Sequence, residues 1–277
     1  MIATVSPDRP LDSLDAGRLD QLLGVSASRF RIEIVGECRS TNTELLERAR
    51  SGSLGPAGAQ PVLVCERQTS GRGRRGAAWY SGAGTSLTFS MLARFPKGPN
   101  ALAGLSLAVA VAVARALEAS GIAQVQVKWP NDLLFEGRKL GGILIELISD
   151  FQGPTCAVIG IGLNVALPPE LRRRIGRPVA DIAQALGRPP RRNELLAGVL
   201  LELDNALAEF SRGGFSAFRS DWTDRHAYQG ERVMLKLGDQ TVAEGEALGV
   251  AEDGALLLRS RHGVERFHSG ELSLRPA

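Results

Sequence analysis

Cysteine and histidine are scarce in this chain, which has three of each among its 277 residues. Cys38, Cys65 and Cys156 are widely spaced and form no C-x-x-C pair. This pattern argues against a disulfide framework and against a zinc site, so we expect reduced cytosolic thiols. The histidines are not at metal-ligand spacing either, and we expect them to be surface or packing residues.

Long apolar runs are also missing. The longest, Ala101–Ala114, is shorter than the roughly 18 residues that a membrane span needs, so it predicts a buried core helix. Near the N-terminus, Asp8, Asp12 and Asp15 stand where a signal peptide needs an apolar run. We therefore expect a cytoplasmic protein without a targeting or membrane segment.

Neither sign of charge dominates. The chain has Lys+Arg 33 against Asp+Glu 30, a net charge of +3, which is too balanced to predict nucleic-acid binding from charge alone. A hydrophobic content of 44% with 23% charged residues is typical of a soluble globular protein. The length allows one large core and a small second domain.

Alternating or short apolar stretches predict strands at 31–35, 61–65, 86–91, 125–129 and 156–165, and a hairpin over 133–147 that turns at 136–138. In the 86–91 strand, Leu87, Phe89 and Met91 alternate with polar residues, which predicts one buried face. From about Tyr228 the chain has short strands with turn sequences at 238–239 and 253–254, which predicts a small all-β terminal domain.

Helices are predicted between these strands. Thr41 and Glu44 fit a capping box at the start of one helix, and Gly52 can end it. Residues 11–24 can form a single helix, and the apolar run continues as a long helix through Ala114. A further helix presents one apolar face, which consists of Leu196, Val199, Leu200, Leu203, Leu207 and Phe210.

A glycine-rich loop, GRGRRG at 71–76, has the spacing of a dinucleotide fingerprint. That fingerprint requires a helix after the loop, whereas here a strand follows, so the dinucleotide interpretation fails. A kinase glycine loop does lie between strands, but the chain has no H-R-D and no D-F-G sequence. The loop remains either a backbone anion site strengthened by its three arginines or a solvated basic turn.

Three further stretches place lysines, amides or glycines at strand ends. They are KWPND at 128–132, RKLGGI at 138–143 and GIGLN at 160–164. Glycines inside strands mark bulges or close approach by a ligand or another backbone. Singly each stretch fits a turn, a surface charge or a packing accommodation, but together they predict one lined pocket.

The ordered set STN (40–42), GRGRRG, KWPND, RKLGGI and GIGLN resembles the biotin protein ligases of bacteria, from about Arg31 to the C-terminus. The resemblance implies an α+β fold: a mixed sheet with helices like that of class II aminoacyl-tRNA synthetases, followed by a small SH3-like β-barrel. It also implies a short N-terminal segment at 1–29, a catalytic domain at 30–226 and a C-terminal domain at 227–277.

The resemblance further implies a two-step reaction. The biotin carboxylate attacks the α-phosphate of ATP and gives biotinyl-5′-AMP and pyrophosphate, and a lysine of biotin carboxyl carrier protein then displaces AMP. Fixed cations are needed where charge builds at the α-phosphoryl group. Mg²⁺ is expected with ATP, with Asp132 as the candidate ligand.

Site residues follow from their positions in the family's motifs. The implied catalytic residues are Arg74, Lys139, Lys128 and Asp132. The implied biotin-binding residues are Ser40, Thr41, Asn42, Gln68, Gly71, Arg72, Gly73, Arg74, Arg75, Lys139 and Gly142. The implied ATP-binding residues are Arg74, Trp79, Asn131, Lys139 and Asn164.

Some features depart from the family or leave alternatives. Members often read QQAGRGRRG where this chain reads RQTSGRGRRG, so Thr69 puts a role for the second glutamine in doubt. A lipoate or octanoate ligase shares the adenylation chemistry but lacks the GRGRRG and KWPND pair. Some relatives repress biotin operons through an N-terminal winged helix, for which the thirty or so residues before the first catalytic strand are too few. We expect no specific DNA binding, and either a monomer or a homodimer.

Overall fold

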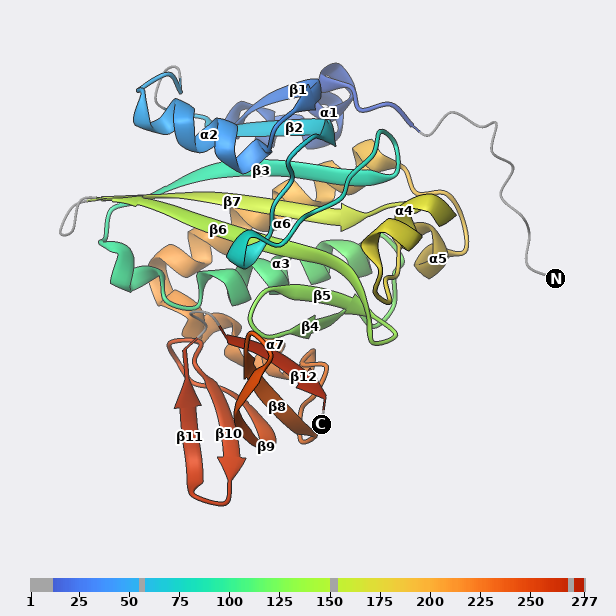
Figure 1. The fold of residues 1–277 in the computed structure, drawn as a ribbon. Helices are drawn as coiled ribbons and strands as arrows, with labels where there is room; N and C mark the ends of the chain where they lie inside the picture. The colour runs from blue at the N-terminus through green and yellow to red at the C-terminus, as the bar shows by residue number, and fades with distance from the viewer. Residues whose placement is uncertain (1–11, 55–57, 150–153, 269–271, 277) are drawn as a thin grey trace.

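The computed structural model describes residues 12–54, 58–149, 154–268 and 272–276. Parts of the expected N-terminal segment (1–11) and of the expected C-terminal domain (269–271 and 277) lie outside the described residues. Figure 1 shows a large mixed α and β body with a small β unit attached at one end.

The body is built on a seven-stranded mixed sheet in the order β1-β2-β3-β7-β6-β5-β4. The β1 and β2 strands are parallel, and every other neighbouring pair is antiparallel. The strands are β1 (Phe30–Cys38), β2 (Gln60–Gln68), β3 (Ser86–Phe95), β4 (Gln126–Lys128), β5 (Asp132–Phe135), β6 (Arg138–Ser149) and β7 (Thr155–Asn164). This sheet confirms the predicted α+β class and each of the predicted strands, with shifted ends.

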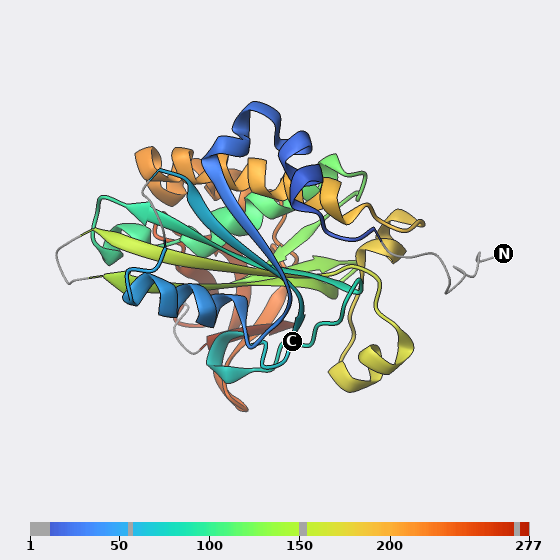
Figure 2. The same cartoon turned by 90° about the horizontal axis from the view of Figure 1, so that it is seen from above.

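Helices cover both faces of the sheet, as the view along it shows (Figure 2). One face carries α1 (Ala16–Leu23), α3 (Leu105–Ala119) and α6 (Arg192–Gly213), and α3 packs against α6. The other face carries α2 (Thr41–Arg50) and the connection from β2 to β3, with α4 (Pro169–Ile175) beside them. The short helices α5 (Ile182–Leu186) and α7 (Arg219–Asp224) and the 3-10 turns 24–29, 74–76, 99–102 and 214–218 complete the body.

The apolar run at 101–114 lies in the core, as predicted. Together with its preceding 3-10 turn, the helix forms Pro99–Ala119, the one stretch of the described residues long and apolar enough by composition to cross a membrane. Of the 18-residue window in it that meets this test, 67% is buried inside the molecule. The helix itself begins after Gly104, whose φ of +79° interrupts the run. The six apolar residues predicted on one face of α6 are all buried.

The β3 strand is buried on both faces, so the prediction of a single buried face was wrong. Ser86, Thr88 and Ser90 are as inaccessible as the leucine and phenylalanine between them. The reason is that α2 covers this side of the sheet, and the hydroxyls of Thr88 and Ser90 are satisfied internally, whereas Ser86 Oγ is buried without a hydrogen-bond partner among the described residues. Thr88 Oγ1, for example, donates to the carbonyl of Cys65 at 2.7 Å.

The capping box predicted at α2 is also replaced by another arrangement. Ser40, not Thr41, is the N-cap residue, and its side chain makes no capping hydrogen bond. Instead Gln68, at the end of β2, accepts the backbone N–H of Thr41 at 2.8 Å. A helix N-terminus accepts such a partner because its first N–H groups have none within the helix. Gly52 follows the helix end with φ +71°, as predicted.

The C-terminal unit is a five-stranded antiparallel sheet in the order β11-β10-β9-β8-β12. Its strands are β8 (Arg232–Leu237), β9 (Gln240–Val250), β10 (Leu256–Ser260), β11 (Gly263–Phe267) and β12 (Leu272–Pro276). The predicted turns at 238–239 and 253–254 both connect strands of this sheet. The indole N–H of buried Trp129 donates to the carbonyl of Gly254 at 3.1 Å and so fastens the sheet to the body.

Candidate active site

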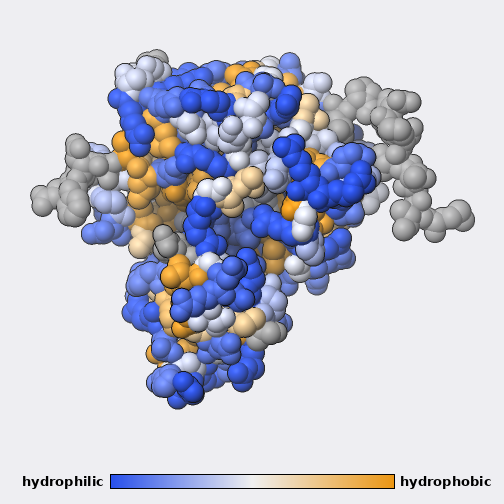
Figure 3. Space-filling model, in the orientation of Figure 1, coloured by the Kyte–Doolittle hydropathy of each residue, from blue (hydrophilic) through white to orange (hydrophobic). Residues whose placement is uncertain are grey.

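A cavity opens on the face of the seven-stranded sheet that carries α2 and the glycine loop. Figure 3 shows hydrophilic residues around a central hollow above the C-terminal sheet. The four predicted motifs STN, GRGRRG, KWPND and RKLGGI all contribute to its lining, as does GIGLN. Of the predicted site residues, all except Gly71 and Asn164 line this cavity.

One end of the cavity is formed by the STN motif at the start of α2. Gln68 Oε1 accepts from the Thr41 N–H and lies 3.3 Å from the Thr41 hydroxyl. The Ser90 hydroxyl lies 2.7 Å from Thr41 Oγ1 and 2.6 Å from Asn42 Oδ1. This end therefore holds polar groups at fixed positions within an otherwise buried wall.

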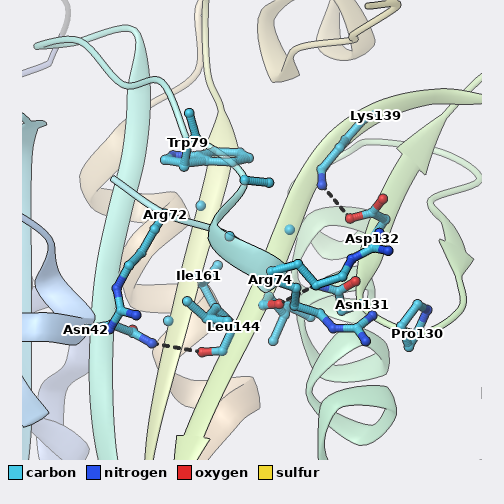
Figure 4. A pocket seen from close by; sticks show the side chains of 18 of the residues that line it. Asn42, Arg72, Arg74, Trp79, Pro130, Asn131, Asp132, Lys139, Leu144 and Ile161 are labelled. Atoms are coloured by element: carbon cyan, nitrogen blue, oxygen red, sulfur yellow. Dashed lines mark hydrogen bonds and ion pairs between the residues drawn. The ribbon is translucent and has the colours of Figure 1, made fainter. Parts of the chain in front are cut away.

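The side chain of Asn42 is anchored to the sheet rather than free in the cavity. Its Nδ2 donates to the carbonyl of Leu144 at 3.1 Å (Figure 4) and to Glu146 Oε2 at 2.9 Å. Asn42 lies so close to β7 that a Cβ on Gly160 would meet its Oδ1 at 2.1 Å. Gly160, the first glycine of GIGLN, is thus required because the STN motif approaches β7 so closely.

The glycine loop crosses the cavity with its arginines on different sides. Arg72 lies on the Asn42 side, where it pairs with both carboxylate oxygens of Glu146 at 2.9 and 3.0 Å. Arg74 lies on the side of Asn131 and Asp132 (Figure 4). Burial lowers the pKa of the Arg74 guanidinium, and Arg75 lowers it further. Arginine nonetheless remains charged at working pH because its ordinary pKa is so high.

Gly71 supports the loop rather than lining the cavity. Its carbonyl accepts the N–H of Trp79 at 2.9 Å, and a Cβ on it would meet the Trp79 carbonyl at 2.5 Å. The indole of Trp79 in turn covers Gly162, where a Cβ would lie 2.5 Å from the ring. Each of the two glycines of GIGLN therefore leaves room for one side chain: Asn42 packs against Gly160, and the Trp79 indole packs against Gly162.

The KWPND turn joins β4 to β5 and faces Lys139, which lies on the neighbouring strand β6. Asn131 Nδ2 donates to the carbonyl of Ile143 at 2.6 Å, which fixes the turn against β6. Lys139 Nζ forms an ion pair with Asp132 Oδ1, and both side chains are largely buried. Gly142 pairs with Asp132 in the sheet and leaves room for the Lys139 ammonium, which would lie 3.2 Å from a Cβ there.

Lys128, the first residue of KWPND, has an altered pKa. Burial lowers the pKa of its ammonium to about 8, and the nearby positive charge of Arg275 contributes. The Asp132 carboxylate opposes this shift. Lys128 also lies 5.9 Å from the ring centroid of Tyr228, close enough for a cation–π contact.

Sequence reasoning missed several residues of this cavity. Arg177, from the segment after α4, and Ser273, Leu274 and Arg275, from β12, also line it. An arginine in an irregular segment or at a strand end gives no pattern that separates it from a surface charge. The C-terminal sheet thus supplies part of the wall, together with Thr88, Leu144 and Ile161 from strands of the body.

A second pocket adjoins the first and shares Trp79 and Lys139 with its lining. Its lining consists of Ala77, Ala78, Trp79, Tyr80, Lys139, Asn164, Ile175, Arg177 and Val179. Asn164 is buried here and uses its Nδ2 to bond the carbonyls of Lys139 at 3.1 Å and Ala180 at 3.0 Å. The indole N–H of Trp79 is buried and has no hydrogen-bond partner among the described residues, and it lies next to Gly162, where a Cβ would be 2.9 Å from Nε1.

No group of three or more histidine, cysteine, aspartate or glutamate side chains that could hold a metal ion occurs in the described part of the chain. All three cysteines are free, and Cys38 and Cys65 are neighbours across β1 and β2. His226 is buried against Trp222, with ring centroids 4.6 Å apart, and is a packing residue.

The site combines fixed hydroxyl and amide groups at one end with a cluster of lysines and arginines at the other. Such a cavity suits a small polar ligand bound next to a phosphate-bearing one. A family model described as Biotin/lipoate A/B protein ligase family matches residues 36–164, and one described as Biotin protein ligase C terminal domain matches residues 228–275.

Known proteins of similar sequence and structure agree. The bifunctional ligase/repressor BirA of Escherichia coli is 35% identical over 273 residues, which span 97% of this chain and 80% of that protein. The biotin–[acetyl-CoA-carboxylase] ligase of Mycobacterium tuberculosis is 35% identical over 257 residues, 91% of this chain and 92% of that protein. A solved biotin protein ligase from Aquifex aeolicus, in complex with biotin and ATP, has a TM-score of 0.74 and 31% identity and covers 89% of this chain and 99% of its own.

The chain therefore belongs to the biotin protein ligase family, and it is an enzyme of the ligase class. The two-part fold agrees with this assignment: the first family model ends with β7, and the second spans the strands of the C-terminal sheet.

Proposed function

We propose that this enzyme activates biotin with ATP to biotinyl-5′-AMP and then transfers biotin to a lysine of biotin carboxyl carrier protein. The observation that carries the proposal is one cavity in which a polar end, built by the STN motif and Gln68, faces a cationic end built by Arg74, Lys128 and Lys139. Both ends are needed, because the reaction joins the carboxylate of biotin to the α-phosphate of ATP, so both substrates must bind in the same cavity.

The cationic end matches the charge that the first step develops. Attack of the biotin carboxylate on the α-phosphorus forms a C–O–P anhydride and releases pyrophosphate, and negative charge spreads over the phosphoryl oxygens meanwhile. Fixed positive groups in a water-poor cavity stabilise that charge without reorganising. Lys139 and Arg74 take this role in the proposal, and the Asp132 carboxylate holds the Lys139 ammonium in place until the nucleotide arrives.

The polar end suits the ureido ring of biotin, which has both donors and acceptors. Asn42 contributes mainly by fixing the wall, since its Nδ2 is already bonded to Leu144 and Glu146. Ser40 and Gln68 then remain the best-placed groups to contact the ring, because Ser40 makes no capping bond and only the Gln68 oxygen is bonded to α2. The apolar part of biotin would contact Ile161 and Leu144.

The purine base of ATP is assigned to the second pocket, against the Trp79 indole. An aromatic face suits a flat base, and Trp79 is part of the lining of this pocket. Mg²⁺ suits the phosphates, since magnesium keeps several waters and is commonly held by one or two carboxylates together with substrate phosphates. Asp132 is the carboxylate of this chain that would take part, and its Oδ1 is shared with Lys139.

Pyrophosphate release tests the first step. The purified protein should release pyrophosphate from ATP and Mg²⁺ when biotin is added, and should do so far more slowly with lipoate or octanoate. Equal rates with lipoate and biotin would contradict the assignment of the polar end. The matched control is the variant Lys139→Gln, which keeps the size of the side chain but removes the ammonium and should lose pyrophosphate release with every acid.

A further inference from the structure

The segment between α7 and β8 extends the edge of the seven-stranded sheet beside β4. Val127 on β4 makes two backbone hydrogen bonds of 2.9 Å with the residues on either side of His226. His226 thus forms a parallel bridge with Val127. Because parallel chains advance side by side, the next residue of β4, Lys128, lies beside Tyr228. This contact lies where the body meets the C-terminal unit, below β4 in Figure 1.

The register brings the ring of Tyr228 to the ammonium of Lys128. Lys128 Nζ lies 5.9 Å from the ring centroid, inside the roughly 6 Å range of cation–π attraction. Lys128 lines the cavity of the candidate active site, whereas Tyr228 is not among the described residues that line it. The ring can therefore affect a ligand in this cavity through the lysine that it contacts.

The ring of Tyr228 is held in turn by two further rings. His226 meets it edge-on, with centroids 6.3 Å apart and ring planes at 80°, and His226 stacks on Trp222 with centroids 4.6 Å apart. Both His226 and Trp222 are buried. The Tyr228 carbonyl also accepts the N–H of Glu231 at 3.1 Å, which fixes the turn that leads into β8. Core packing thus gives the ring a defined position.

The ammonium of Lys128 lies among other positive charges. Arg275 and Lys139 repel it, and the Asp132 carboxylate that attracts it is already paired with Lys139. The flexible aliphatic stem of a lysine would let the ammonium turn away from these like charges. The ring of Tyr228 attracts the ammonium and opposes this movement, and it does so without neutralising the charge as a carboxylate would.

We propose that Tyr228 is a positioning residue whose ring holds the Lys128 ammonium at the cationic end of the cavity, so that the ammonium faces the phosphates of ATP. The inference rests on the proposed function, since ATP is taken as the ligand. A long side chain that is already held loses less freedom when the ligand binds. Loss of the ring should therefore weaken ATP binding, while the chemical step keeps its rate once both substrates are bound.

The test compares two variants and a control with the wild-type protein. Tyr228→Leu removes the ring and keeps an apolar side chain, and Tyr228→Phe keeps the ring. Phe267→Leu is the matched control, because Phe267 is also a partly buried aromatic residue packed against the core, and no cation–π contact of its ring occurs in the described part of the chain. Each protein is measured for kcat and for the KM of ATP and of biotin in pyrophosphate release.

For Tyr228→Leu we expect the KM of ATP to rise about three- to tenfold, the effect of losing a cation–π contact in a partly desolvated site. The values of kcat and of the KM of biotin should change by less than about twofold, because the lysine itself is still present. Tyr228→Phe should restore the wild-type KM of ATP, and Phe267→Leu should leave it unchanged. A merely structural role of Tyr228 would lower kcat and raise both KM values together.

A double-mutant cycle shows whether the ring acts through the lysine. Lys128→Met removes the ammonium and keeps the length of the side chain. In the Lys128→Met protein, adding Tyr228→Leu should leave the KM of ATP unchanged, because the ring then has no cation to hold. The same three- to tenfold rise in both backgrounds would overturn the inference.

A spectroscopic measurement covers the case in which the leucine variant does not fold. The chain has two tyrosines, so the protein labelled with 3-fluorotyrosine should give two fluorine NMR signals, and the signal missing in Tyr228→Phe belongs to Tyr228. That signal should move in Lys128→Met, while the signal of Tyr80 should stay in place. A Tyr228 signal at the same position in both proteins would show that the ring does not sense the ammonium, and the inference would be wrong.

Failure of the proposed function gives a different result. ATP affinity is also measured by calorimetry, with and without biotinol, an alcohol analogue of biotin that has no carboxylate to react. A wild-type protein that binds ATP but releases no pyrophosphate with biotin would refute the function, and the Tyr228 variants could still be compared by ATP affinity. A wild-type protein that releases pyrophosphate, with equal KM values for ATP in Tyr228→Leu and Tyr228→Phe, would refute the positioning role alone.

Discussion

Adding one methyl group at Gly160 should disable the biotin end of the site. A Cβ there would lie 2.1 Å from Asn42 Oδ1 and 2.8 Å from its Cγ. Ordinary contact distances begin well above 3 Å, so Asn42 must move by about 1 Å or more. That movement breaks the bonds of Asn42 to Leu144 at 3.1 Å and Glu146 at 2.9 Å, as well as the 2.6 Å contact with Ser90.

The magnitude follows from these contacts. Overpacking a well-filled site costs about 1–3 kcal/mol, and each buried polar group left without a partner costs a further ~1–3 kcal/mol. We therefore expect Gly160→Ala to lower the free energy of unfolding by about 2–4 kcal/mol. If the distorted STN motif of the folded protein binds biotin ~1.4 kcal/mol or more weakly, the KM of biotin rises at least tenfold.

Urea unfolding and biotin-dependent pyrophosphate release measure the two effects. Gly36→Ala is the matched control, because Gly36 also lies in a strand of the same sheet but a Cβ on it would have nothing within 4 Å. That control should be neutral or slightly stabilised. The reasoning is refuted if Gly160→Ala has the stability and biotin KM of Gly36→Ala.

The remaining predictions concern charge and pH. Arg74→Gly should retain adenylate formation but release the intermediate ~10- to 100-fold faster, since a charge-assisted contact is worth ~1.5–3 kcal/mol. Bystander proteins mixed into the assay should then carry biotin on lysines. Loss of pyrophosphate release without bystander labelling would place Arg74 in the first chemical step. The KM of ATP should rise as the pH passes about 8, where the ammonium of Lys128 loses its proton, and Lys128→Arg should abolish this rise; a pH profile identical in both proteins would contradict it. Burial lowers the pKa of His226 to about 4, so below pH 6.5 the unfolded chain binds a proton that the folded chain does not. The free energy of unfolding should therefore fall by up to about 3 kcal/mol between pH 6.5 and pH 4. His226→Phe should flatten that pH dependence in urea titrations. The protein should give no gel shift with biotin-operator DNA that survives competitor DNA and moderate salt, with or without biotin and ATP.

The sequence predicted the residues that meet at the cavity because their patterns carry backbone information. Glycines inside a strand have few uses, and Gly160 and Gly162 proved to be sites of close approach by Asn42 and Trp79. Alternation and length likewise located the strands and the core helix. Boundaries were less certain: α3 begins only after Gly104, because its positive φ breaks the apolar run.

Features that depend on contacts across the fold could not be predicted from local patterns. Alternating Ser and Thr in β3 indicate a solvent face unless a helix covers it, and only the packing of α2 decides that. Gln68 replaces the expected capping residue at Thr41 from a strand far along the chain. Arg177 and Arg275 reach the cavity from separate elements, so no spacing in the sequence relates them to Lys128 or to each other.

Transfer of biotin to protein is the central claim, and mass spectrometry of a carrier domain tests it most directly. The wild-type protein, incubated with ATP, Mg²⁺, biotin and a biotin carboxyl carrier domain, should add one biotin to a single lysine of the carrier. A carrier with that lysine changed to arginine should stay unmodified. An unmodified wild-type carrier in the presence of measured pyrophosphate release, or equal modification of the carrier by lipoate, would contradict the account.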